Sequence, residues 1–166
     1  MCSSDLMPAN TIASNLTLVV PNATLYHFGI LSSTMHNAWV RYTCGRLESR
    51  YRYSAGIVYN NFPWPEIPAN KQQAAIEQAA QAVLDARAAH PAASLATLYD
   101  PQTMPAAADL VKAHQKLDAA VDAAYNWKGK HSDADRIALL FERYEALIAT
   151  WNATHATAPD LVAATE

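Results

Sequence analysis

The chain has 166 residues, of which 51% are hydrophobic and 16% are charged, and a formal net charge of −3; this is long enough for one domain or two small ones and argues against a disordered chain. Its two cysteines include no CxxC pair and no Cys/His cluster at zinc-ligand spacing, which excludes a disulfide framework and a structural zinc site and favours a reducing cytoplasm. Because it has no apolar run of about 18 residues and begins without the regions of a signal peptide, we expect neither a membrane protein nor a secreted one.

Two short apolar runs near the N-terminus are typical of β-strands. They cover residues 16–20 and 25–30, and a turn-forming Pro-Asn-Ala sequence at 21–23 separates them, so they are predicted to pair or to lie side by side. A helix is predicted next, because Ser32 can cap its start and Gly45 suits a left-handed helix end. Its apolar side would consist of Met35, Ala38, Trp39 and Tyr42.

Charged side chains alternate with apolar ones directly after this helix. Successive residues of a strand point to opposite faces. As a single strand, the segment would place Arg46, Glu48, Arg50 and Arg52 on one face and Leu47, Tyr51 and Tyr53 on the other. Residues i and i+2 of a strand lie about 6.6 Å apart, close to two base-pair steps of about 3.4 Å each. The segment therefore predicts a strand that contacts base edges in a DNA major groove, and the simpler alternative is a solvated edge strand.

Positive charge is concentrated in the same part of the chain. Residues 1–65 hold four arginines and two acidic residues, a balance of 4 − 2 = +2, whereas the rest holds eight basic and thirteen acidic residues, a balance of 8 − 13 = −5. Arginine can bind guanine or phosphate through two hydrogen bonds. Positive charge made only of arginine is therefore more typical of specific recognition than a diffuse lysine coat would be.

A segment rich in aromatic, amide and proline residues follows at 55–69. Its prolines at 63, 65 and 68 predict an ordered loop without a regular element. Amide side chains can contact adenine or phosphate, which makes Asn60 and Asn61 candidate DNA contacts. Phe62 and Trp64 either stack on an exposed base or, as the tendency of large aromatics to be buried favours, anchor the loop to the helix at 32–43.

From residue 70 onward the patterns are helical and rich in alanine. Helices are predicted over about 70–89, from Asp109 to before Gly129, and from the cap residue Ser132 through Trp151, with a proline-containing connection at 91–108. Each helix has an apolar stripe, so the three are expected to cover one another as a small antiparallel bundle. The predicted fold class is α+β, with a small strand and helix module over 1–69 and a mainly α-helical bundle over 70–166.

The sequence contains no constellation typical of catalysis. Its six histidines are scattered and have no Cys or Asp partner at the spacing of a metal or nucleophilic site. The GxGxxG, GxxxxGK(S/T) and GxSxG patterns are absent. We therefore predict no catalytic residue, no metal site and no cofactor site in this chain.

Four stretches of the first half are specific enough to suggest a family: LYHFGILSSTMHNAWVR at 25–41, CGRL at 44–47, YRYS at 51–54 and IVYNNFPWP at 57–65. They closely resemble the C-terminal end of MmeI-like enzymes. These are type IIL restriction-modification proteins that combine an endonuclease, an adenine-N6 DNA methyltransferase and a target recognition domain in one chain. LVKAHQ at 110–115 and LDAAVDAAY at 117–125 resemble the closing helical segment of the same family.

The resemblance implies roles for the arginine-rich segment. In that family the positions after Gly-Arg-Leu contact bases, often as Lys-x-Asp or Glu-x-Arg, so Glu48 and Arg50 would form the specificity pair and Arg52 a further base contact. Arginine toward guanine O6 and N7 and glutamate toward cytosine N4 would recognise one C·G pair, and Lys-x-Asp would invert the preference. DNA backbone contacts or support are expected from Arg46, Ser49, Tyr51, Tyr53, Asn60 and Asn61.

The resemblance also implies a larger parent protein. This chain lacks the family's Gly-rich cofactor segment, its Asn-Pro-Pro-aromatic motif and its nuclease motif. It is therefore expected to be a C-terminal piece of a parent that uses S-adenosylmethionine, with Mg²⁺ for cleavage, and to have double-stranded DNA and the upstream methyltransferase domain as partners. The alternative is a helical protein–protein interaction module, in which residues 70–155 bind a protein and the arginine strand is only an edge.

Overall fold

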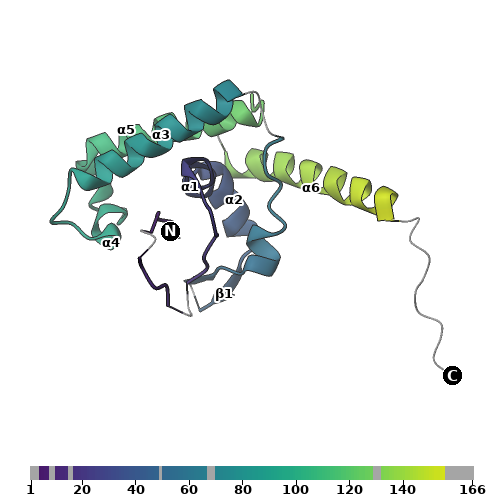
Figure 1. Cartoon of the computed structure of the whole chain (residues 1–166), viewed down its shortest axis with the longest axis horizontal. Coiled ribbons are helices and arrows are strands. Elements are labelled where there is room, and N and C mark those ends of the chain that lie inside the picture. The colour runs from purple at the N-terminus through teal and green to yellow at the C-terminus, as the bar shows by residue number, and fades with distance from the viewer. Residues whose placement is uncertain are drawn as a thin grey trace.

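The computed structural model describes residues 4–7, 10–14, 17–48, 50–66, 70–128 and 132–155. Helices α1 (Leu25–Ser32) and α2 (Thr34–Thr43) lead into an antiparallel hairpin of β1 (Gly45–Leu47) and β2 (Arg50–Arg52), and a π-helix, η1 (Ala55–Tyr59), follows. The elements described after it are α3 (Asn70–Ala88), α4 (Leu95–Leu98), the 3₁₀ helix η2 (Met104–Ala106), α5 (Ala108–Ala124) and α6 (Asp133–His155). A small strand module followed by a helical part confirms the predicted α+β class (Figure 1).

Residues 25–32 form a helix, whereas the sequence predicted a strand over 25–30. Helix α1 begins after Thr24, whose backbone N–H donates to His27 Nδ1 over 3.2 Å, and its central residues are buried. A short run that is apolar on every side fits a buried helix as well as a buried strand, and periodicity does not separate the two. Of the other predicted strand, residues 17–20 have no regular structure, and residue 16 lies outside the described residues.

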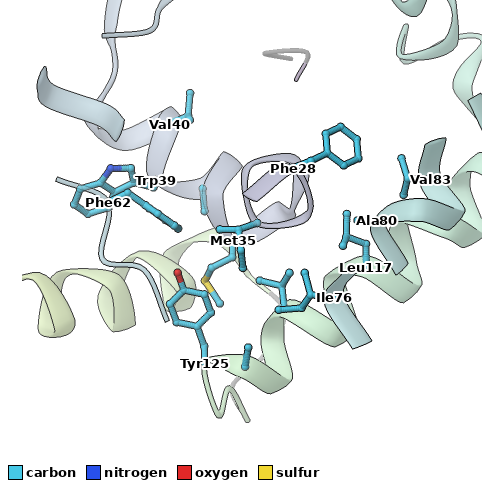
Figure 2. Close-up of a cluster of buried hydrophobic side chains, with 14 of the residues drawn as sticks. Phe28, Met35, Trp39, Val40, Phe62, Ile76, Ala80, Val83, Leu117 and Tyr125 are labelled. Atoms are coloured by element: carbon cyan, nitrogen blue, oxygen red, sulfur yellow. The ribbon is translucent and has the colours of Figure 1, made fainter. Parts of the chain in front are cut away.

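Helix α1 lies very close to α3 and α5 at Gly29. A Cβ atom at this position would lie 2.8 Å from Ile76 Cγ2, 3.3 Å from Ala80 Cβ and 3.3 Å from Leu117 Cδ1. Figure 2 shows Ile76, Ala80 and Leu117 beside α1 in the buried cluster. Glycine is therefore required for three helices to meet at this distance.

Helix α2 runs from this core to the hairpin. Its cap is Ser33, whose Oγ accepts a hydrogen bond from the His36 N–H at 3.2 Å, and not the predicted Ser32. The helix ends at Thr43, and Gly45 is the first residue of β1 and not a left-handed helix end as predicted. The physical reason is strand pairing: Gly45 pairs with Arg52, which requires an extended backbone.

Helices α3 and α5 lie side by side, as their apolar stripes predicted (Figure 1). Ile76 and Val83 of α3 and Val121 of α5 are fully buried. The connection between the two helices packs onto α5, where Tyr99 Oη lies 2.6 Å from His114 Nε2. Of the described elements, these two helices pack against each other most extensively.

Helix α6 joins the other helices through its first half only, and it does not lie along both α3 and α5. Its first half packs against α2, where the Trp39 ring centroid lies 5.4 Å from that of Phe141 and 5.9 Å from that of Tyr144. The reason is that α1 and α2 already cover the pair formed by α3 and α5. Residues 145–155 are all exposed, and this half of α6 extends away from the other helices (Figure 1).

The buried core is continuous across residue 70, where we predict the domain boundary. One hydrophobic cluster contains Trp39 and Phe62 before this point and Leu117 and Leu140 after it. A hydrogen bond from a side chain to the backbone crosses the same point, since the Tyr125 hydroxyl donates to the Pro63 carbonyl oxygen over 3.0 Å. The part of the chain before residue 70, which includes the hairpin, therefore packs directly on the helices that follow it.

Candidate nucleic-acid interface

The arginine-rich segment is a hairpin and not the single strand that its alternating charges predicted. Three cross-strand pairs define its register: Gly45 with Arg52, Arg46 with Tyr51 and Leu47 with Arg50. Glu48 follows β1 and has a φ of 58°, the left-handed conformation typical of hairpin turns. Alternation was misleading because the segment lacks the Asn-Gly or Asp-Gly sequence that usually marks such a turn. Ser49, a predicted supporting residue, lies outside the described residues.

This register decides which side chains share a face. Paired residues of an antiparallel ladder point to the same side, and neighbours along a strand point to opposite sides. Arg50 and Arg52 therefore share a face, as predicted, and Leu47 lies on that face too. Arg46 lies on the opposite face with Tyr51. The predicted faces of Arg46 and Leu47 were wrong, because the chain reverses between β1 and β2.

Glu48 and Arg50 form an ion pair at the hairpin tip. Arg50 Nη2 lies 3.1 Å from Glu48 Oε2, and the side chains are 74% and 76% exposed, respectively. Water screens an ion pair this exposed, so the pair contributes little to folding stability. Each side chain can therefore exchange the other for a different hydrogen-bonding group, with Arg50 as donor and Glu48 as acceptor.

The opposite face of the hairpin carries a stacked pair. The Arg46 guanidinium carbon lies 4.5 Å from the Tyr51 ring centroid, and Arg46 Nη2 donates to Tyr51 Oη over 3.3 Å. Tyr51 packs in turn against the core, so its ring holds the guanidinium in place. Arg52 is exposed on the other face. The hairpin thus presents arginine to both sides.

Tyr53 connects the base of the hairpin to α2. Its hydroxyl lies 3.0 Å from His36 Nε2, and the Phe62 ring meets the His36 ring edge-on at a centroid distance of 4.6 Å. Burial of His36 lowers its pKa to about 4, so the ring is neutral near pH 7. Tyr53, a predicted backbone or supporting contact, is therefore bonded within the scaffold.

Residues 55–59 form the π-helix η1, where the prolines predicted no regular element. The prolines begin only at 63, which leaves these residues able to form a helical turn. Asn61 Nδ2 donates to the carbonyl oxygens of Gly56 at 3.0 Å and Ile57 at 3.1 Å. The amide thereby gives two carbonyl groups of this short helix a hydrogen-bond partner. Asn60 is exposed. Of the two predicted amide contacts, Asn60 is thus the one that is open to solvent.

Aromatic side chains fix this segment to the helices beneath it. Phe62 is buried, with its ring centroid 6.2 Å from that of Trp39, which confirms the predicted anchoring to α2. Trp64 packs instead beside α1, with its centroid 5.7 Å from the His27 ring. Trp39 Nε1 also donates to the Val58 carbonyl oxygen over 3.0 Å. This connecting role of Trp39 was missed, because in the sequence it is only one member of an apolar helix face.

Family models match nearly the whole of this arrangement. The model described as "MmeI, target recognition domain" matches residues 2–66, and the model described as "MmeI, C-terminal domain" matches residues 67–152. The chain belongs to the MmeI family. The hairpin and η1 lie in the part that matches the MmeI target recognition domain, and α3 begins the part that matches the MmeI C-terminal domain.

Two known proteins show the extent of the similarity. DNA methyltransferase A of Bacillus subtilis (strain 168) is 44% identical over 142 residues, which are 86% of this chain and 16% of that protein. A solved structure of the type IIL restriction-modification enzyme MmeI in complex with DNA is 57% identical, with a TM-score of 0.74, over 78% of this chain and 17% of that chain. The chain therefore spans about one sixth of the length of either protein.

The described part of this MmeI-family chain has neither a metal cluster nor a membrane-spanning helix. Over these residues, no group of three or more His, Cys, Asp or Glu side chains could hold a metal ion. The described helices are too short or too polar to cross a membrane. His90, which follows α3, and Asp109, in the first turn of α5, form a pair with His90 Nε2 3.0 Å from Asp109 Oδ1.

Proposed function

We propose that this chain recognises DNA sequence for a site-specific adenine-N6 DNA methyltransferase with restriction activity, and that its hairpin enters the major groove of double-stranded DNA. The observation that carries the proposal is the exposed Glu48–Arg50 pair at the tip of a hairpin that matches a target recognition domain. The relatives support it, because one is named a DNA methyltransferase and the other is a restriction-modification enzyme in complex with DNA.

The shape and chemistry of the hairpin suit a major groove. The groove, about 12 Å wide, admits a two-stranded ribbon. Arginine donates two hydrogen bonds to guanine O6 and N7, and glutamate accepts one from cytosine N4. Because Glu48 and Arg50 are close enough to bond each other, they can meet the two bases of one C·G pair. On binding, the base edges replace the hydrogen bond that Glu48 and Arg50 now make with each other.

Other residues of the interface are assigned roles from their positions. Arg52 shares the face of Arg50 and is assigned a further base contact, whereas Arg46 lies on the opposite face and is assigned a phosphate. Exposed Asn60 is assigned a second phosphate contact. Supporting roles go to four residues: Tyr51, Tyr53 and Asn61, which are bonded within the scaffold, and Ser49, on its sequence position.

The charge distribution supports an orientation with the hairpin toward the duplex. Residues 1–65 carry a balance of +2, and the rest of the chain carries −5. The phosphates of DNA attract the first part and repel the second. We therefore propose that residues 1–69 contact DNA and that residues 70–166 support them from behind. The two family models meet between residues 66 and 67, which supports this division.

The chemical steps are assigned to a parent polypeptide. The matched segment is only 16% and 17% of the two relatives, so most of each relative lies outside it. The proposed parent has an upstream methyltransferase domain that binds S-adenosylmethionine and a nuclease that needs Mg²⁺, and it acts in the bacterial cytoplasm. It turns the target adenine out of the duplex while this chain holds the recognition site.

Binding of the full-length parent to duplexes that each change one base pair tests the proposal. Arg50→Ala is expected to weaken binding to the cognate duplex by about 1–3 kcal/mol and to abolish discrimination at one position. Glu48→Gln is expected to relax the same position. Arg41→Ala, which removes an arginine outside the hairpin, is the matched control and should leave discrimination intact. Unchanged discrimination in both hairpin variants would refute the proposal.

A further inference from the structure

Leu47 is an apolar side chain on the same face of the hairpin as two arginines. It pairs with Arg50, and Arg50 and Arg52 lie two residues apart in β2, so the three share one face. Leu47 is 59% exposed. Tyr51 packs against the core from the opposite face, so the face with Leu47 is directed away from the core. Folding therefore leaves most of this leucine available to a ligand.

The neighbours of Leu47 on this face indicate the kind of ligand. Arg50 and Arg52 are both exposed, and the remaining residue of the face, Gly45, has no side chain. A Cβ atom at Gly45 would meet no atom within 4 Å, so the face is also open at this end. The centre of a protein interface is depleted in charged residues, whereas the phosphates of a duplex attract arginine. A leucine between arginines therefore suits DNA better than an apolar protein surface.

The chemistry of leucine restricts what it can contact on a duplex. Its side chain has no hydrogen-bond donor or acceptor, so it cannot bind a phosphate or a polar base edge. The 5-methyl group of thymine is the apolar group that bases present in the major groove, and apolar side chains recognise it there. Leu47 therefore matches thymine.

The register of the hairpin gives the position of that thymine. The Cβ atoms of directly opposed residues lie about 4.5–5.5 Å apart, and successive base pairs lie about 3.4 Å apart. Leu47 can thus reach the base pair that Arg50 contacts or the next one. The C·G pair assigned to Glu48 and Arg50 has no methyl group, which leaves the next base pair. A site with a target adenine contains at least one thymine, opposite that adenine.

We propose that Leu47 is a further specificity-determining residue, which contacts the 5-methyl group of a thymine in the base pair next to the C·G pair. The proposal rests on the proposed function, because it takes the C·G pair and the major-groove orientation from there. The hairpin then recognises two neighbouring base pairs, one through hydrogen bonds and one through an apolar contact.

Binding of the full-length parent to duplexes in which one thymine at a time is replaced by uracil tests this contact. Uracil pairs with adenine as thymine does and lacks only the methyl group. For the wild type, one replacement should weaken binding about fourfold, as expected for one methyl group removed from an apolar contact. The sensitive thymine should lie next to the base pair at which Arg50→Ala loses discrimination. Leu47→Ala should bind the thymine and uracil duplexes equally, and Leu47→Met, which keeps an apolar side chain, should retain the preference.

The matched control is Ile57→Ala, at a residue of η1 that is 56% exposed, which should keep the preference for thymine. An unchanged preference in Leu47→Ala, or no sensitive thymine next to the Arg50 position, would overturn the proposal. If Arg50→Ala still loses discrimination in that case, the Leu47 contact alone is refuted. Unchanged discrimination in both Glu48→Gln and Arg50→Ala would instead refute the proposed function, and the Leu47 contact with it.

Discussion

The carboxylate of Asp118, on α5, accepts two hydrogen bonds from Thr34, the first residue of α2. The Thr34 backbone N–H donates to Oδ1 at 2.7 Å, and its hydroxyl donates to Oδ2 at 2.6 Å. A negative charge at this end of a helix also interacts favourably with the helix dipole. Since α2 ends at Thr43 and the hairpin begins at Gly45, a residue of the helical part holds the helix that carries the hairpin.

Removal of this contact should destabilise the chain. Asp118→Ala is expected to lower the free energy of unfolding by about 1–2 kcal/mol, because it removes two hydrogen bonds at a helix start. Urea denaturation of the 166-residue chain measures the effect. Asp118→Asn keeps one acceptor oxygen and should lose less. Asp85→Ala, at an exposed position of α3, is the control; an equal loss in both alanine variants would show that Asp118 has no special role.

The close approach at Gly29 predicts the sign of another substitution. In an open helix, Gly→Ala stabilises by up to about 1 kcal/mol. At position 29 the new Cβ would lie 2.8 Å from Ile76 Cγ2. We therefore expect Gly29→Ala to destabilise by about 1–3 kcal/mol, as overpacking does. Gly56→Ala is the matched control, because a Cβ there would meet no atom within 4 Å. Thermal unfolding compares the two, and stabilisation by Gly29→Ala would contradict the observed packing.

The buried ring of His36 predicts a dependence of stability on pH. Its pKa is lowered from 6.5 to about 4 by burial, so the unfolded chain takes up a proton at a higher pH than the folded chain does. Protonation therefore favours unfolding, and stability is lost as the pH falls from about 6.5 to about 4, by roughly 3 kcal/mol in total. Above about pH 6.5 the ring contributes no pH dependence.

Urea denaturation at several pH values compares the wild type with His36→Gln. The variant should lose less stability between pH 6.5 and pH 4, whatever its stability at pH 7. It should still show some loss, because burial also lowers the pKa of His114. Tyr53→Phe removes the hydroxyl near His36 Nε2 but keeps the titrating ring, so its pH dependence should remain. Identical slopes for His36→Gln and the wild type would rule out a buried neutral histidine.

The position of Arg46 on the face opposite Arg50 predicts a loss of affinity that does not depend on sequence. Arg46→Ala should weaken binding of the parent to all duplexes alike and reduce the slope of log K against log salt by about one, as expected for one lost phosphate contact. Titrations at several salt concentrations with cognate and altered duplexes measure both quantities. A change at one base pair only would instead assign Arg46 to a base.

Long amphipathic helices were predictable from this sequence. The start of α3 at Asn70, the cap position at Ser132 and the paired stripes of α3 and α5 agree with the prediction, because helical periodicity over many residues and cap residues are local signals. The anchoring of Phe62 was predictable for a similar reason, since large aromatics tend to be buried.

Short elements were not predictable, because tertiary contacts decide them. Residues 25–32 are helical because α3 and α5 pack closely against them at Gly29. No local sequence pattern indicates this packing. The hairpin turn depends on Glu48 in a left-handed conformation, for which glutamate has no preference. The exposed half of α6 has the same apolar stripe as the buried half, so the sequence alone did not reveal where packing ends. Glu48 and Arg50 could be predicted from the sequence as candidate base contacts. Their position at the tip of a hairpin could not be predicted.

The most direct test of the central claim is the methylated DNA motif of a bacterial host that expresses the full-length parent. Sequencing that detects N6-methyladenine is expected to show a motif that changes at one base pair when Glu48 and Arg50 are replaced together by Lys and Asp. The matched control reverses another exposed ion pair, Arg41 with Asp133, and should keep the original motif. An unchanged motif in the Glu48→Lys, Arg50→Asp variant, with methylation still present, would contradict base recognition by the hairpin.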